Sequence, residues 1–143
     1  VSLTLLRSPI YPDFFADEGR HGFTYSLFSH DSTDALKAVT EAESLNKPLV
    51  LASGSLNLSE DCLQISARNL KVLALKHSES TGYVLRLAEV EGRCGVASVR
   101  TSLPFSRCWI SNILEDRVCE LPVVDGRVQL EYRQFGIHTL IFE

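Results

Sequence analysis

Apolar and polar side chains alternate along most of the chain, in short segments that turn residues separate. A period of two places one row of side chains on a buried face and the other in solvent, which predicts strands of antiparallel sheets. An Asp-Gly pair at 125–126 is typical of a two-residue hairpin turn between two such segments. About nine or ten strands are expected, in residues 1–8, 23–28, 48–52, 63–67, 70–75, 83–90, 96–99, 108–114, 128–132 and 135–142.

One segment has a helical period instead. Residues 31–34 offer N-cap side chains, and Pro48 ends a helix because it disfavours helical geometry at the residue before it. Between them, apolar residues recur every three or four positions. We therefore predict one short helix over residues 33–45. The fold class that follows is mainly β, an antiparallel β-sandwich in a single domain covering residues 1–143, with a closed β-barrel as the alternative.

Residues 9–22 interrupt the strand pattern with two prolines, two glycines and several charges, which predicts a long loop. Long loops in compact domains tend to be functional or to pack against another part of the protein. One interpretation is a solvated loop held by a contact between Asp17 and His21. The other is a loop at the edge of a neighbouring active site, where Asp17 or His21 contacts substrate. Arg7, beside the loop, is either an anchor for a carboxylate or a substrate-binding residue.

Composition narrows the class of protein. Hydrophobic residues make up 45% and charged residues 22% of the 143 residues, which is an ordinary globular balance. The net charge of −4 gives no reason to expect a nucleic acid or an anionic membrane as partner, and no apolar stretch is long enough to span a bilayer. The four cysteines show no C-x-x-C spacing and are expected to be buried free thiols, and Trp109 is expected in the core.

No catalytic or metal-binding motif is present in the sequence. The four histidines are scattered, and neither H-E-x-x-H nor G-x-S-x-G occurs. The sequence begins at Val1 inside an apolar segment and contains no methionine. We therefore expect a piece cut from a longer polypeptide.

Several blocks of residues resemble one known family. The blocks are Leu5-Leu6-Arg7-Ser8-Pro9, Pro12-Asp13, Ala16-Asp17-Glu18-Gly19-Arg20-His21-Gly22-Phe23-Thr24-Tyr25, Glu41-Ala42-Glu43-Ser44-Leu45-Asn46-Lys47-Pro48-Leu49, Val84-Leu85-Arg86-Leu87-Ala88-Glu89 with Gly92, and Phe135-Gly136-Ile137-His138-Thr139-Leu140. In these blocks the chain is similar to the C-terminal β domain of glycoside hydrolase family 38 α-mannosidases, in the branch that includes the cytosolic and vacuolar enzymes. At Ala88 the family usually has an aromatic residue, which is a departure.

The resemblance implies a cytoplasmic, retaining α-mannosidase that removes terminal mannosyl residues from glycans. It places the Asp nucleophile and a zinc or other divalent metal in the catalytic part of the enzyme, so this fragment is expected to have no catalytic residue, no metal site and no activity alone. Its expected partners are the N-terminal catalytic domain of the same chain and a mannose-containing oligosaccharide. Arg7, Asp17 and His21 are the candidates for the rim of the active site.

Two other classes of function remain open from the sequence. An independent carbohydrate-binding module would carry exposed aromatic rings on one sheet face. A structural or adhesive sandwich would carry a large apolar patch for a protein partner.

Overall fold

The computed structural model describes residues 2–7, 9, 11–30, 35–47, 51, 53–54, 62–79 and 81–143. Among them are one helix and nine strands, and every strand pairing is antiparallel. The elements are α1 (Ala35–Asn46), β1 (Leu63–Ile65), β2 (Leu70–His77), β3 (Tyr83–Glu89), β4 (Gly95–Thr101), β5 (Cys108–Ser111), β6 (Arg117–Leu121), β7 (Val123–Val124), β8 (Arg127–Tyr132) and β9 (Ile137–Phe142).

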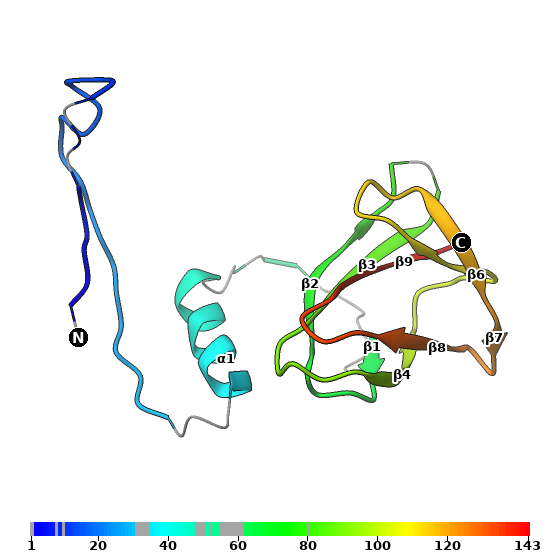
Figure 1. Ribbon diagram of the computed structural model, residues 1–143. Coiled ribbons are helices and arrows are strands. Elements are labelled where there is room, and N and C mark those ends of the chain that lie inside the picture. Colours follow the sequence, from blue (N-terminus) through cyan, green and yellow to red (C-terminus); the bar gives the residue numbers. More distant parts are fainter. Residues whose placement is uncertain are drawn as a thin grey trace.

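The strands form two separate sheets that face each other. One sheet has the order β1-β4-β8-β7 and the other the order β2-β3-β9-β5-β6, as the two layers in Figure 1 show. Among the described strands each sheet keeps two unpaired edges, so the predicted sandwich is confirmed and the alternative of a closed barrel is wrong.

Alternate residues of facing strands fill the space between the sheets. Ten buried side chains make up the core, and the aromatic rings of Phe105 and Phe142 meet edge to face with 4.9 Å between their centroids. Burying each large aliphatic side chain contributes roughly 1.5–3 kcal/mol, so this layer is the main source of the sandwich's stability. The core side chains are Leu70, Leu85, Leu87, Ala97, Val99, Cys108, Val128, Leu130, Leu140 and Phe142.

One local prediction is confirmed in detail, and one predicted strand, β2, shows a feature that was not predicted. The Asp-Gly pair turns between β7 and β8 with φ of 50° and 69°, the positive values that a type I′ hairpin requires. The strand at 70–75, whose sequence is apolar on both faces, contains a register shift between Val72 and Ala74, and this bulge leaves Leu73 exposed.

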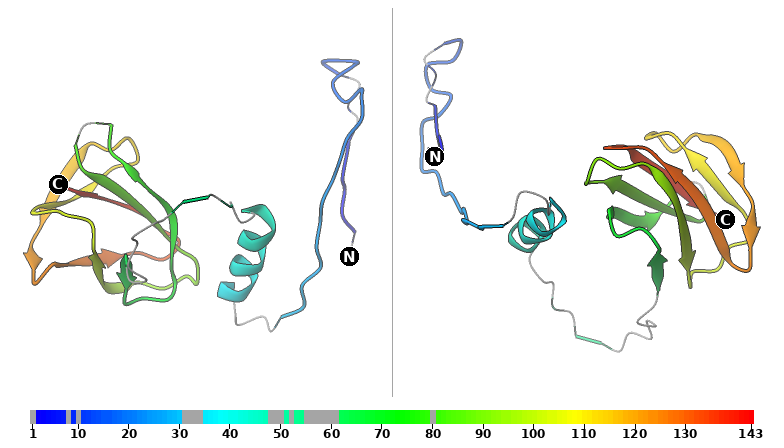
Figure 2. Two further views of the ribbon diagram at one scale, coloured as in Figure 1. Left: turned by 180° about the vertical axis from the view of Figure 1, so that it is seen from behind. Right: turned by 60° about the horizontal axis from the view of Figure 1, so that its bottom comes forward.

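The N-terminal part of the chain differs from the prediction. Residues 2–7 and 23–28, expected to be strands, are extended but pair with no strand among the described residues. The helix begins at Ala35 and ends at Asn46, and residues 31–34, which were expected to cap it, lie outside the described residues, as does most of the strand expected at 48–52. Figures 1 and 2 show residues 2–30 reaching away from the sandwich, on the far side of α1.

An ion pair joins α1 to the sandwich. Glu43 forms an ion pair of 3.1 Å with Lys71 of β2, and this hydrogen bond is the main cause that lowers the pKa of Glu43. Residues 26–30 and α1 border a hollow of about 250 Å³ lined by Phe28 and Leu45. The helix thus lies between the N-terminal segment and the sandwich.

Candidate functional site

The predicted loop folds on itself as a compact turn over residues 13–21. The main-chain N–H of Phe15 donates to the Asp13 carboxylate at 2.9 Å, and that of Glu18 donates to the Phe15 carbonyl at 3.1 Å. The Nε2 of His21 lies 2.9 Å from the carbonyl oxygen of Asp17, so Nε2 carries the proton and donates it. The turn is therefore held by its own polar groups.

The structure brings Asp17 and His21 together and leaves Arg7 apart from them. The contact uses the main chain of Asp17, so its carboxylate makes no hydrogen bond or ion pair with any described residue. Arg7 is exposed and likewise forms no ion pair in the described part of the chain. The Asp17 carboxylate and the Arg7 guanidinium thus remain open to an outside ligand or domain, whereas the His21 ring already donates to the Asp17 carbonyl.

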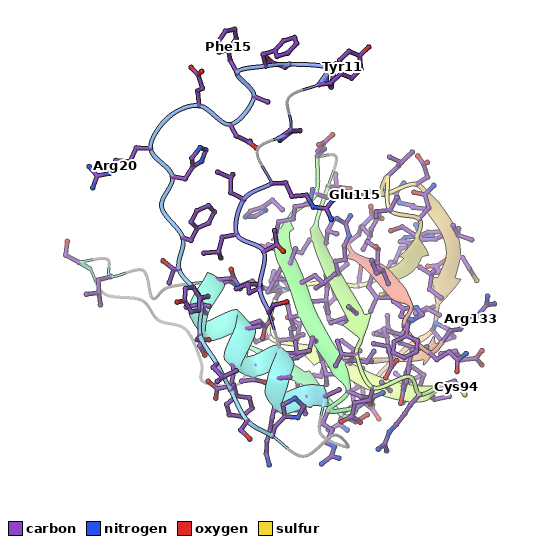
Figure 3. The ribbon with its side chains drawn as sticks, turned by 60° about the vertical axis from the view of Figure 1, so that its left-hand side comes forward. Tyr11, Phe15, Arg20, Cys94, Glu115 and Arg133 are labelled. Atoms are coloured by element: carbon purple, nitrogen blue, oxygen red, sulfur yellow. The ribbon has the colours of Figure 1, made fainter. Side chains whose placement is uncertain are left out.

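Large apolar side chains surround these polar groups. Tyr11 is 84% exposed, and it lies with Phe15 at the outer tip of the turn (Figure 3). Tyr25 and Leu27, on the neighbouring extended segment, are 69% and 97% exposed. Soluble domains seldom leave a run of aromatic and aliphatic side chains uncovered, which marks this segment as an interaction surface.

Trp109 does not lie in the core, and the prediction that it would is wrong. It points outward from β5 because Cys108, the preceding residue, takes the inward position. The guanidinium groups of Arg107 and Arg117 lie 4.7 and 5.8 Å from the centre of the indole ring. These cations cover the ring, so it offers no open flat face of the kind on which sugars stack.

Ion pairs hold the two arginines over the indole. Arg107 makes two hydrogen bonds to Glu120, at 2.7 and 3.1 Å, and this contact lowers the pKa of Glu120. Arg117 pairs with Glu143, and that hydrogen bond is the main cause of the lowered pKa of the Glu143 carboxyl. Both pairs are at the surface, so each contributes little to stability on its own.

The cysteines are only partly as expected. All four are free thiols, but Cys94 and Cys119 are exposed and Cys62 is half-buried. Cys108 alone is fully buried among the four, and burial raises the pKa of its thiol to about 12. Cys119 is exposed because β6 is an edge strand with little protein on either side.

Glu89, which sequence reasoning did not single out, is a buried carboxylate at the end of β3. One of its oxygens accepts hydrogen bonds from Asn69 Nδ2 and Glu91 N, both at 2.9 Å, and the other accepts from Gly92 N and Phe135 N, both at 2.8 Å. Burial opposes ionisation, but these hydrogen bonds prevail and lower the pKa of Glu89 to about 2.

The signal for Glu89 was available in the strand pattern. Leu85, Leu87 and Glu89 follow at intervals of two, so a carboxylate occupies a core position. Its four donors use both oxygens, and they come from the β1–β2, β3–β4 and β8–β9 connections. Glu89 therefore joins these three connections through its hydrogen bonds.

The described residues hold no group of three or more histidine, cysteine or carboxylate side chains that could bind a metal ion. In the same part of the chain, no helix is long and apolar enough to cross a membrane.

The comparisons with known proteins agree with the fold. A sequence model of the glycosyl hydrolases family 38 C-terminal beta sandwich domain matches residues 69–140, which run from Asn69 to β9. The chain is 32% identical over 151 aligned positions to alpha-mannosidase 2C1 of Homo sapiens and equally to that of Mus musculus, with 99% of this chain covered. It is 30% identical over 128 positions, 81% of its length, to alpha-mannosidase G of Dictyostelium discoideum.

The relatives are much longer proteins. The chain spans 14% of the length of the human and mouse relatives and 12% of that of the Dictyostelium protein. No solved structure matches it. Because the family model matches the strands of the sandwich, the chain belongs to the glycosyl hydrolase family 38 C-terminal β-sandwich domains.

Proposed function

We propose that this chain is the C-terminal β domain of a retaining, metal-dependent α-mannosidase that releases terminal α-D-mannosyl residues from glycans in the cytoplasm. The observation that carries the proposal is the whole-chain alignment with proteins named alpha-mannosidase, in which 99% of this chain corresponds to only 14% of the relative. The larger remainder of such an enzyme is where its reaction centre belongs.

The chemistry of a retaining glycosidase supports this division. It needs a carboxylate nucleophile and an acid/base carboxyl about 5–5.5 Å apart on either side of the glycosidic bond. The buried carboxylate of this domain, Glu89, has both oxygens occupied by hydrogen bonds from its own loops. In the proposed enzyme, zinc or another divalent ion lies in the catalytic domain, and the isolated C-terminal domain has no activity.

The sandwich and its N-terminal segment then have a supporting role. The exposed aromatic side chains of residues 11–28 pack on the catalytic domain of the same polypeptide, where they lose contact with water. In this arrangement Arg7, Asp17 and His21 lie at the rim of the active site. The free Asp17 carboxylate accepts hydrogen bonds from sugar hydroxyls, and the self-contacts of the turn keep it in place.

The test is the variant Asp17→Asn in the full-length enzyme. Loss of one charge-assisted hydrogen bond weakens binding by roughly tenfold or more, so we expect KM for a mannoside to rise by about that factor. Glu18→Gln, at the exposed next residue, is the matched control and leaves KM unchanged. Unchanged turnover and unchanged KM in Asp17→Asn would remove Asp17 from the rim.

A second measurement separates this function from an independent sugar-binding module. Calorimetry of the isolated chain with mannose should detect no binding, in keeping with the arginine-covered indole of Trp109. Saturable binding of mannose by the chain alone would favour the module.

A further inference from the structure

Two arginines face each other on the outer surface of the four-stranded sheet. Arg100 of β4 and Arg127 of β8 are directly opposed in the antiparallel register, and both are exposed. Opposed like charges at this spacing destabilise a sheet. Neither guanidinium forms an ion pair with any carboxylate among the described residues. The two arginines thus form a positive centre with no ion-pair partner in the described part of the chain, in a protein of net charge −4.

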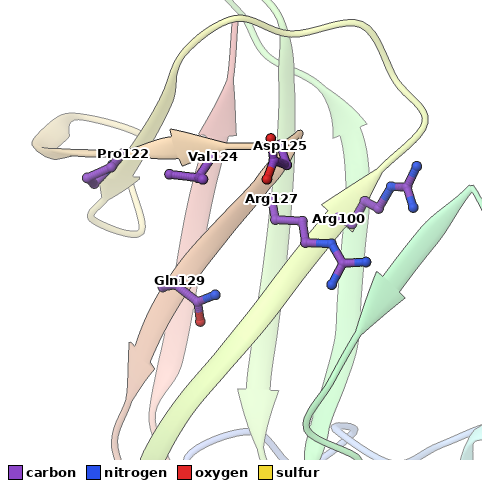
Figure 4. A pocket seen from close by; sticks show the side chains of 6 residues that line it. All are labelled: Arg100, Pro122, Val124, Asp125, Arg127 and Gln129. Carbon is purple, nitrogen blue, oxygen red and sulfur yellow. The ribbon is translucent and has the colours of Figure 1, made fainter.

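The pair lies where two hollows of the surface meet. Both arginines line a hollow of about 490 Å³ beside the β7–β8 turn and a second of about 150 Å³ beside β1. The larger hollow has the size of a small-molecule site. Figure 4 shows the Arg127 side chain extending toward β4, the strand that carries Arg100, with Gln129 farther along β8 and Val124 on β7.

The remaining lining suits an anion with a polar body. Gln64, Ser66 and Ser98 add neutral hydrogen-bonding groups around the smaller hollow. Asp125, at the turn, repels an anion and so directs it toward Arg100 and away from the turn. A hydroxylated ring in the larger hollow would lie between the amide of Gln129 and the apolar side chain of Val124.

We propose that Arg100 and Arg127 bind the phosphate group of a phosphorylated sugar, whose ring occupies the larger hollow. A phosphate monoester carries close to two negative charges at neutral pH, which matches two guanidinium groups. Each guanidinium presents a planar fork of N–H donors that fits two phosphate oxygens at once. A single carboxylate would balance only one of the two cations. The site lies in the sandwich itself and is independent of mannosidase activity.

Calorimetric titration of the chain tests the site with mannose 6-phosphate, inorganic phosphate and mannose as probes. We expect saturable binding of mannose 6-phosphate that weakens at least tenfold in Arg100→Gln and in Arg127→Gln, and that weakens as salt is added. Arg133→Gln is the control, because Arg133 is an exposed arginine outside both hollows. Tighter binding of mannose 6-phosphate than of inorganic phosphate supports the sugar ring; equal binding identifies free phosphate as the ligand and overturns the sugar assignment.

Thermal unfolding provides a second readout. Without ligand, the Arg127→Gln variant should have a higher Tm than the wild type, because one of two opposed cations is removed. Mannose 6-phosphate should raise the Tm of the wild type and not that of the variant. Absence of saturable binding by either phosphate probe, or equal binding after both arginines are replaced, overturns the proposal. If the chain binds neither phosphate probe and Arg100→Gln destabilises the full-length enzyme, the two arginines contact an acidic protein surface instead.

Discussion

The replacement of Glu89 by glutamine is the sharpest test of how this sandwich is held together. Each Glu89 oxygen accepts two hydrogen bonds, and three of the four donors are main-chain N–H groups. An amide can accept at one oxygen only, so its NH₂ group would face two N–H donors whichever way it turned. Two buried donors would then lose their acceptor, and each such loss costs about 1–3 kcal/mol.

The pKa of Glu89 gives an independent magnitude. The gap between its ordinary value of 4.5 and about 2 corresponds to about 3 kcal/mol of stabilisation, at about 1.4 kcal/mol for each pH unit. The side chain is only 3% exposed, so solvent screens it little. Because the folded-state pKa is depressed, this stabilisation is complete above pH 4.5 and is lost as the pH falls toward 2. The two arguments agree on a loss of about 3 kcal/mol in the glutamine variant.

The assay is urea unfolding followed by the fluorescence of Trp109, the single tryptophan. At pH 7 the free energy of unfolding of Glu89→Gln should lie about 3 kcal/mol below that of the wild type, and the two should converge between pH 4.5 and 2.5. Glu131→Gln, at an exposed position of β8, should change it by less than about 0.5 kcal/mol. A difference under 1 kcal/mol at pH 7, or one that persists unchanged to pH 2.5, would refute the reasoning.

Three further outcomes follow from the same structure. In thiol labelling at pH 8, the exposed Cys94 should react promptly and Cys108 only after unfolding, because burial raises the pKa of the Cys108 thiol to about 12. Peptide mapping identifies the labelled cysteines, and early labelling of Cys108 would contradict its burial. Gly126→Ala should lower the free energy of unfolding in urea by about 1–2 kcal/mol, because only the positive φ opposes a side chain there. Gly82→Ala should lower it much more, because the added Cβ would collide with the main chain of β9. Equal losses in the two variants would argue against that close approach. Proton NMR should give His138 a pKa below 6.5, mainly because the ring is partly buried. The neutral form of His138 then contributes stability above pH 6.5, and this stability is lost as the pH falls through the folded-state pKa. A pKa above 6.5 would be inconsistent with this environment.

The strands could be predicted from sequence where one face is buried. In β8 the alternation of core and surface residues is regular, and in β3 it is regular from Leu85 to Glu89. The positive φ of Asp125 and Gly126 follows from their residue types. The family resemblance also covered the strands that the family model matches.

The edge strands were harder to predict because they have little buried surface to pattern. In β6 four of the five residues are exposed, so no alternation identifies the strand. Trp109 was predicted in the core because hydrophobicity alone does not say which face of β5 is inward. Its outward position is favoured by Arg107 and Arg117, which lie ten positions apart in the sequence, so no local pattern connects them with the indole.

The N-terminal segments show a different limit. Residues 23–28 alternate as a strand does, but alternation describes a face and does not supply a neighbouring strand for hydrogen bonds. The same limit applies to Arg7, Asp17 and His21. The sequence placed them in or beside a loop, and the structure joins Asp17 to His21, whereas the described residues provide no ion-pair partner for Arg7.

The order of the five-stranded sheet constrains how the protein is made. The segment that lies between β3 and β5 is β9, which is the last strand along the chain. Until residues 137–142 leave the ribosome, the β2–β3 and β5–β6 hairpins have no strand to join them, and each exposes an edge that can pair with other nascent chains. Synthesis that stopped before Ile137 would therefore yield a product that aggregates, and a cell would need to protect this region until translation had passed that point.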